Sequence, residues 1–154
     1  MNIHVRKGVK QDIPHVLELI KELALYEKEP NEVIVTIESM ERDGFGSNPL
    51  FYFYVAEVEE YGVRKIIGIA LYFMRYSTWK GKCVFLDDIV VTEKFRKNGV
   101  GSMLFDALLE ECRAIGAKRL EWQVLDWNQP AINFYKKYQA KFMDEWLNCR
   151  LVFD

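Results

Sequence analysis

Three observations in the sequence predict a mixed α/β (α+β) fold, in which a mostly antiparallel central sheet is flanked by helices. First, the segments 51–58, 66–72 and 81–91 read as strands separated by short turns, which is typical of an antiparallel meander. Second, beyond residue 100 the apolar residues recur at helical spacing and another strand follows, so a helical crossover must join two parallel strands. Third, 154 residues of which 50% are hydrophobic can fill one core but not two ordinary ones. We therefore expect a single domain over residues 1–154.

The first third of the chain predicts a short strand and two helices. Residues 2–6 alternate between polar and apolar side chains, as a half-buried strand does. Asp12 can cap the helix that follows. The apolar positions of that helix form one continuous stripe, made of Ile13, Val16, Leu17, Ile20, Leu23 and Ala24. Thr36 is placed to cap a shorter helix, which the sequence Asp-Gly-Phe-Gly at 43–46 ends.

The second half predicts helices between strands. A helix from about Gly101 to Ile115 ends at Gly116, a strand covers 119–125, and Asn128 starts a helix over 130–138. Phe142 and the segment 147–153 read as closing strands.

Charge and composition narrow the class of protein. The 23 acidic and 21 basic residues give a net charge of -2, so no overall cationic field attracts nucleic acid or a membrane surface. No apolar run has membrane-spanning length, and residues 1–7 lack the apolar core of a secretory signal. We therefore expect a cytoplasmic protein without nucleic-acid or membrane partners.

Cysteine and histidine give no sign of metal or covalent chemistry. Cys83, Cys112 and Cys149 are widely separated, so we expect three small core residues rather than a disulfide framework or zinc site. His4 and His15 both lie near the N-terminus, which disfavours a cysteine–histidine nucleophile. No metal-binding motif is present, and we expect no metal.

The loop 96–101, Arg-Lys-Asn-Gly-Val-Gly, is a candidate phosphate cradle because it joins a buried strand to an amphipathic helix. The first turn of a helix presents unpaired N–H groups and the positive end of the helix dipole, and both hold a pyrophosphate. Glycines let the phosphate approach the backbone closely. Taken alone, the same loop can equally be a cationic surface turn.

Asp87 and Asp88 interrupt an otherwise apolar strand. Successive strand residues face opposite sides, so the two carboxylates diverge unless a bulge intervenes. A poorly hydrated carboxylate has a raised pKa, which suits a general base or a cation-binding group. A wet edge position is the alternative, and the apolar flanks favour a functional cleft.

The helix after Asn128 carries a candidate acid. Capping alone explains Asn128 and Pro130, and Tyr135 can simply pack in the core. A phenol and an alkyl thiol bind a proton with comparable affinity, so Tyr135 can also protonate a departing thiolate.

Four further segments occur in order along the chain: Ile-Lys-Glu-Leu-Ala with Tyr-Glu over 20–27, Asp-Gly-Phe-Gly over 43–46, Trp-Lys-Gly-Lys over 79–82, and Trp-Asn-Gln-Pro-Ala-Ile-Asn-Phe-Tyr-Lys over 127–136. With the loop 96–101, which matches an R/Q-x-x-G-x-G/A pattern, they resemble the GNAT superfamily of N-acetyltransferases, and within it the diamine (spermidine/spermine) N-acetyltransferase branch. The resemblance runs nearly end to end and implies a GNAT-like sheet.

The resemblance also implies a site. Acetyl-CoA contacts are implied at Ile89, Val90, Val91, Arg96, Lys97, Asn98, Gly99, Val100, Gly101, Ser102, Asn128 and Tyr135. Amine contacts are implied at Tyr26, Glu27, Trp79, Asp87 and Asp88. Tyr135 is implied as the acid for the CoA thiolate and Asp87 as a catalytic carboxylate, and the base is Asp87, Asp88 or a water that passes the proton to one of them.

The expected activity is acetyl transfer from acetyl-CoA to a primary amine of a small cationic acceptor, by direct attack in a ternary complex. The resemblance also implies a homodimer. Two other functions stay open: a CoA-binding sensor with little turnover, and acetylation of a peptide amine.

Departures from the branch bear on the acceptor. The polyamine enzymes tend to carry Glu at the position of Asp87, an acidic residue and a proline at Ser77-Thr78, and tryptophan at Cys149. The amine pocket is therefore expected to be less acidic. A shorter diamine, thialysine or another lysine-like amine fits it at least as well as a long polyamine.

Overall fold

The computed structural model describes residues 2–154. The chain divides into two compact units, with the boundary between Gln123 and Val124.

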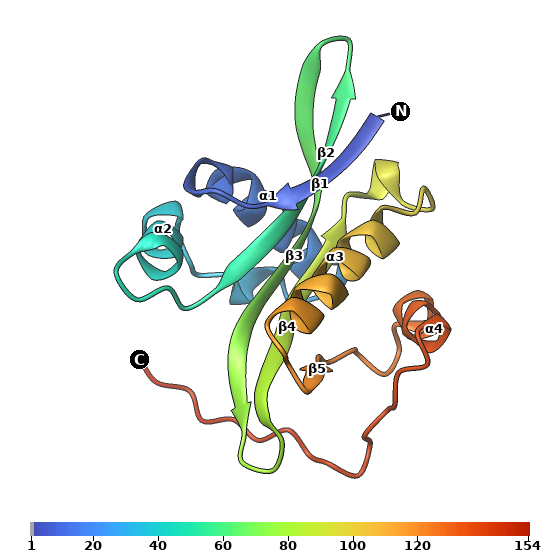
Figure 1. The fold of residues 1–154 in the computed structure, drawn as a ribbon. Coiled ribbons are helices and arrows are strands. Elements are labelled where there is room, and N and C mark those ends of the chain that lie inside the picture. The colour runs from blue at the N-terminus through green and yellow to red at the C-terminus, as the bar shows by residue number, and fades with distance from the viewer. Residues whose placement is uncertain (1) are drawn as a thin grey trace. The chain divides into compact units, whose positions relative to one another are not determined.

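A five-stranded sheet forms the first unit. Its strands are β1 (Asn2–Lys7), β2 (Tyr52–Glu60), β3 (Val63–Ser77), β4 (Gly81–Val91) and β5 (Arg119–Glu121), in the spatial order β1-β2-β3-β4-β5 (Figure 1). The first four strands pair antiparallel and β5 pairs parallel to β4. This confirms the predicted mixed, mostly antiparallel sheet with one parallel crossover. The bounds of β4 match the prediction, whereas β3 is longer than expected because it pairs with β4 up to its last residue.

Helices pack on both faces of this sheet. The first face carries α1 (Ile13–Tyr26) and α2 (Ile37–Phe45), and the opposite face carries α3 (Val100–Ala114) (Figure 1). Short 3-10 turns lie at η1 (Lys10–Asp12), η2 (Pro30–Glu32) and η3 (Glu93–Phe95). The core under α1 and α2 comprises Ile13, Val16, Leu17, Leu19, Met40, Phe53, Val55, Ile69, Leu71 and Val90.

The two predicted N-caps have different outcomes. Thr36 caps α2 as predicted, because its Oγ1 accepts a hydrogen bond from Ser39 N at 3.1 Å. Asp12 precedes α1 but does not cap it, so that prediction is wrong. Its buried carboxylate instead accepts hydrogen bonds from Arg6 and from Val9 N, both at 2.8 Å. A buried carboxylate is better satisfied by a guanidinium than by one backbone N–H.

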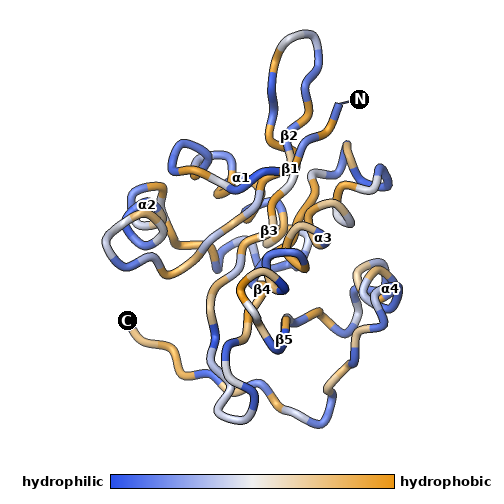
Figure 2. Tube along the Cα trace, in the orientation of Figure 1, coloured by the Kyte–Doolittle hydropathy of each residue, from blue (hydrophilic) through white to orange (hydrophobic). Residues whose placement is uncertain are grey.

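The second unit holds α4 (Gln129–Lys137), which Asn128 caps by accepting a hydrogen bond from Ala131 N at 3.4 Å. The strands predicted at Phe142 and over 147–153 are wrong, because these residues form no strand. The predicted strand 119–125 is also too long, since β5 pairs with β4 only at three positions. Alternation alone does not make a strand where no neighbouring strand offers backbone partners. The apolar end of the chain is visible in Figure 2.

Two of the three cysteines meet the expectation of core residues. Cys83 and Cys112 are buried, whereas Cys149 is exposed, so the expectation for Cys149 is wrong. It lies in the segment without strand partners. Within residues 2–154, no helix is both long and apolar enough to cross a bilayer.

Candidate active site

A β-bulge lies at the centre of the candidate site. In the pairing of β3 with β4, Leu71 lies opposite Asp88 and Tyr72 lies opposite Leu86, so Asp87 is an extra residue without a partner. A bulge breaks the alternation of side chains and turns the bulged residue toward its neighbour's side. The bulge that allows Asp87 and Asp88 to lie on the same side of the sheet is therefore present.

Three carboxylates repel one another at this bulge. Burial, together with the charges of Asp87 and Glu27, raises the pKa of Asp88 to about 7. Burial raises the pKa of Asp87, and burial and the charge of Asp87 raise that of Glu27. We call Glu27, Asp87 and Asp88 the carboxylate cluster. Around neutral pH the carboxylates of such a cluster repel one another, and a bound cation would reduce that repulsion.

The end of α1 brings Tyr26 and Glu27 to the site. The helix ends at Tyr26, and Glu27 N donates to Leu23 O at 2.9 Å, which fixes Glu27 just beyond the last turn. Tyr26 is partly exposed, and the guanidinium carbon of Arg96 lies 5.6 Å from its ring centroid. Two predicted amine-pocket residues thus lie beside the carboxylates of β4 and the predicted phosphate loop.

The backbone beyond β4 has the shape that a phosphate cradle needs. Lys97 and Gly99 both have left-handed backbones, with φ of 67° and 77°. Asn98 Nδ2 donates to Phe95 O at 3.1 Å and so fixes the turn from inside. Gly99 occupies the N-cap of α3, and a Cβ placed there would meet nothing within 4 Å. The backbone at the start of α3 is therefore uncovered at Gly99 by the described residues, as a loop that binds a pyrophosphate requires.

The cofactor positions predicted on β4 lie at its last residues. Ile89, Val90 and Val91 pair with β3 on one edge. On the other edge β5 pairs only with Cys83, Val84 and Phe85, so β4 has no strand partner there beyond Phe85 among the described residues. Backbone groups along this edge that face no strand can receive the amides of a pantetheine arm, while Val91 O already accepts a hydrogen bond from Arg96 Nε at 2.9 Å.

Trp79 is not brought to the carboxylate cluster. It lies in the turn between β3 and β4 and is 79% exposed. Asp87 is six residues beyond the start of β4 at Gly81, which places it about 20 Å along the strand from that turn. Ser77, whose Oγ accepts hydrogen bonds from Trp79 N and Lys80 N, shapes the turn.

Asn128 and Tyr135 belong to the second unit. Asn128 is buried and caps α4. Tyr135 is also buried, and its ring meets that of Phe134 edge to face at 5.4 Å. The structural role that the sequence suggested for Asn128 is confirmed, while the cofactor and acid roles of both residues remain predictions.

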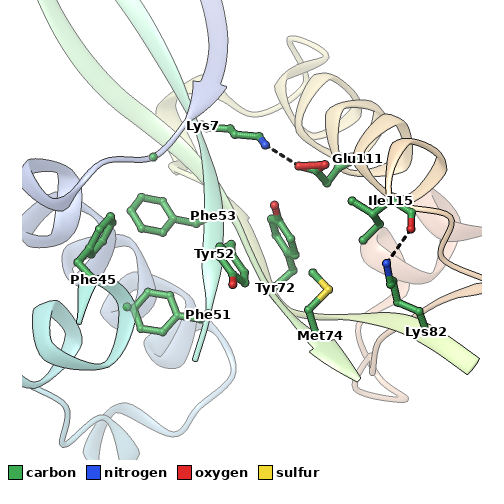
Figure 3. Close-up of a pocket in the computed structure, with 12 residues that line it drawn as sticks. Lys7, Phe45, Phe51, Tyr52, Phe53, Tyr72, Met74, Lys82, Glu111 and Ile115 are labelled. Carbon is green, nitrogen blue, oxygen red and sulfur yellow. Dashed lines mark hydrogen bonds and ion pairs between the residues drawn. The ribbon is translucent and has the colours of Figure 1, made fainter. Parts of the chain in front are cut away.

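The structure also contains a pocket that the sequence did not predict (Figure 3). It has a volume of about 450 Å³ and aromatic walls, and it is lined by Lys7, Gly8, Gly44, Phe45, Phe51, Tyr52, Phe53, Tyr72, Met74, Lys82, Glu111 and Ile115. Near one end Glu111 accepts hydrogen bonds from Lys7 Nζ at 2.7 Å and from Tyr54 Oη at 3.3 Å. None of the predicted site residues lines it, and periodicity gives no signal for a cluster assembled from so many elements.

Comparison with known proteins agrees with this geometry. Residues 15–140 match the acetyltransferase (GNAT) family. A thialysine N-epsilon-acetyltransferase of Bos taurus is 36% identical over 148 residues, covering 93% of this chain and 86% of that protein. A spermidine/spermine N(1)-acetyltransferase-like protein 1 of Homo sapiens is 34% identical over 85% of this chain and 19% of that protein. An aminoglycoside acetyltransferase from an uncultured soil metagenomic sample has the same fold, with a TM-score of 0.78, 16% identity, and coverage of 99% of this chain and 97% of that one.

Proposed function

Because the chain belongs to the acetyltransferase (GNAT) family, we propose that it transfers the acetyl group of acetyl-CoA to a primary amine of a small cationic acceptor. A diamine, a polyamine or a thialysine-like amine is the proposed class. The relatives named thialysine N-epsilon-acetyltransferase, which reach 36% identity over 93% of the chain, support this class.

The carboxylate cluster is the observation that carries the proposal. Glu27 follows α1, and Asp87 and Asp88 lie on the bulge of β4, close enough that Asp87 raises the pKa of Glu27 and that Asp87 and Glu27 both raise the pKa of Asp88. Among residues 2–154 no group of acidic, histidine or cysteine side chains is arranged to hold a metal. A diamine carries two amino groups, so one ammonium can pair with the carboxylates of the cluster while the other amine reacts.

The proposed reaction needs one base and one acid. Asp87 or Asp88 takes a proton from the acceptor ammonium, directly or through water, and the freed nitrogen attacks the thioester carbonyl carbon. A backbone N–H at the open edge of β4 stabilises the negative oxygen that develops. The C–S bond then breaks as Tyr135 gives its proton to the CoA sulfur, and the nitrogen loses its second proton, which returns to the Tyr135 oxygen directly or through water. The products are an N-acetyl amine and free CoA.

The proposed acetyl-CoA site follows β4 into α3. The last residues of β4, Ile89, Val90 and Val91, would bind the pantetheine arm through their main chain, and Asn128 would add a contact. The loop from Arg96 to Ser102, namely Arg96, Lys97, Asn98, Gly99, Val100, Gly101 and Ser102, would hold the pyrophosphate. The left-handed Gly99 and the open space at its Cβ position support this assignment.

The proposed acceptor is short. Ser77 and Thr78 stand where the polyamine branch tends to carry an acidic residue and a proline, so the turn between β3 and β4 offers no carboxylate to the far ammonium of a long polyamine. Of the predicted amine-pocket residues, Tyr26, Glu27, Asp87 and Asp88 lie at the carboxylate cluster, whereas Trp79 lies in the turn between β3 and β4. Three of these carry charge, which suits one or two ammonium groups rather than the four of a long polyamine.

We further propose a cytoplasmic homodimer without nucleic-acid or membrane partners. The net charge of -2 supports the absence of polyanion binding. The exposed apolar side chains of the chain's last segment support self-association, since contiguous apolar surface usually marks an interface.

Release of free CoA from acetyl-CoA tests the proposal. The purified protein is assayed with putrescine, spermidine, spermine, thialysine, lysine and a short peptide at several pH values. We expect selective turnover of a short diamine or thialysine-like amine. Turnover of the peptide alone would make the chain a peptide acetyltransferase, and tight acetyl-CoA binding without turnover of any amine would make it a binding module.

A further inference from the structure

Helix α1 contacts the strand-to-loop segment 92–96 at both of its ends. Thr92 Oγ1 donates a hydrogen bond to Glu22 Oε1 at 2.9 Å. At the other end, Arg96 lies over the ring of Tyr26. Glu22 and Tyr26 are one helical turn apart and therefore lie on the same face of α1. Thr92 and Arg96 are likewise four residues apart, so two side chains of one helix hold both ends of one short segment.

Backbone and side-chain hydrogen bonds hold the segment 92–96 in place. Thr92 N donates to Ile67 O at 2.8 Å, and Phe95 N donates back to Thr92 O at 2.9 Å. Phe95 is buried, which anchors the turn η3 in the core. Arg96 Nε donates to Val91 O at 2.9 Å. A displacement of Thr92 is therefore passed on to Arg96 and to the loop that follows.

The carboxylate of Glu22 is only partly hydrogen-bonded within residues 2–154. Glu22 Oε2 is buried and has no hydrogen-bond partner among the described residues. An unsatisfied buried carboxylate oxygen is unfavourable. The hydrogen bond from Thr92 therefore compensates in part for the burial of this carboxylate, and nothing in the proposed chemistry uses Glu22.

We propose that Glu22 and Thr92 are positioning residues for acetyl-CoA, which hold the loop 96–102 in its phosphate-binding geometry through α1. The inference rests on the proposed function, because it assigns the pyrophosphate to that loop. It also links the two halves of the site, since the same helix carries Tyr26 and ends beside Glu27.

The test is the affinity for CoA, measured by calorimetry without any amine, for Thr92→Val, Thr92→Ser and wild type. Valine keeps the shape of threonine and removes the hydroxyl, whereas serine keeps the hydroxyl. We expect Thr92→Val to raise the Kd for CoA about tenfold and Thr92→Ser to stay within about twofold of wild type, as the loss of a hydrogen bond to a carboxylate predicts. Glu18→Gln, an exposed change one turn earlier on α1, is the control and should leave the Kd unchanged.

A second readout separates positioning from general destabilisation. Amide hydrogen exchange of Thr92→Val should quicken over residues 97–102, whereas the β2–β3 turn at 61–62 should exchange as in wild type. An unchanged Kd together with unchanged exchange overturns the inference and leaves the proposed function intact, provided that wild type binds CoA. Failure of Thr92→Ser to restore affinity also overturns it, because the hydroxyl would then not be responsible. If wild type does not bind CoA, the proposed function and the inference fail together.

Discussion

The carboxyl of Asp88 has the most perturbed acidity of the proposed site, and its cause lies in its neighbours. Burial and the charges of Asp87 and Glu27 raise its pKa to about 7. The group therefore changes charge near neutral pH, where an enzyme needs a base. As the pH rises through this value, ionisation of Asp88 should increase catalysis and decrease the stability of the fold. Both effects can be measured.

For catalysis, kcat/KM for the amine should rise with pH through an inflection near 7, because the ionised carboxylate binds and deprotonates the acceptor. Asp88→Asn should remove this inflection and lower kcat/KM about a hundredfold at alkaline pH. Asp87→Asn should shift the inflection to lower pH, because it removes a repulsive charge from Asp88. The measurement is the pH profile of the three proteins. An inflection that stays in place in Asp88→Asn would contradict the assignment.

For stability, the folded chain keeps the proton of Asp88 up to about pH 7, whereas the unfolded chain releases it near the ordinary value of 3.8. Between these values the folded state binds more protons, so this group makes folding less favourable as pH rises. Asp88→Asn does not titrate. Its Tm should exceed that of wild type by a few degrees at about pH 8, and the difference should vanish in acid. Asp144→Asn, at an exposed site, is the control substitution.

Tyr135 is the proposed acid. Tyr135→Phe should lower kcat about a hundredfold and leave the Kd for CoA within about twofold, because only a transition-state proton is lost. The neighbouring Tyr138→Phe is the matched control and should keep wild-type kcat. Stopped-flow release of CoA and calorimetry separate the two quantities. Equal loss of CoA affinity in Tyr135→Phe would mean that the hydroxyl holds the cofactor instead.

At the scale of elements, the two ends of α3 offer an internal comparison. Gly99 precedes the helix and Gly116 follows it, with φ of 77° and 73°, and a Cβ at either position meets nothing within 4 Å. Replacement by alanine therefore costs only backbone strain, about 1 kcal/mol at each site. Gly99→Ala and Gly116→Ala should lower the free energy of unfolding similarly. Only Gly99→Ala should weaken CoA binding, and equal CoA affinities of the two variants would count against the loop as phosphate cradle.

Elements defined by local signals were predictable from the sequence, whereas those that depend on distant residues were not. Thr36 and the bounds of β4 were predictable, because capping chemistry and a bounded apolar run are local signals. The sequence allowed a bulge at Asp87 but could not predict it, because the bulge arises from the register in which β4 pairs with β3. Asp12 and the closing strands were mispredicted because their outcome depends on long-range partners: Arg6 competes for Asp12, and the segment 147–153 has no strand beside it. The Glu22–Thr92 bond joins residues 70 apart and has no local signal.

At the scale of the whole molecule, the last segment of the chain is the strongest sign of self-association. Leu147, Leu151, Val152 and Phe153 are each more than 80% exposed. We expect sedimentation velocity to show a dimer, and the double change Leu151→Asp with Phe153→Asp to shift it toward monomer by removing apolar contact. Val63→Asp, at an exposed apolar site of β3, is the control. A wild-type protein that stays monomeric at every concentration would refute the proposed dimer.

The central claim is that the carboxylate cluster selects a small acceptor by its second positive charge. The most direct measurement compares kcat/KM for putrescine and for its monohydroxy analogue, in which one amine is replaced by a hydroxyl of nearly the same size. Putrescine should be preferred about tenfold or more, because its analogue lacks an ion pair with a partly buried carboxylate, and Asp87→Asn should reduce this preference. Equal kcat/KM for the two acceptors, or a preference for the hydroxyl analogue, would contradict it.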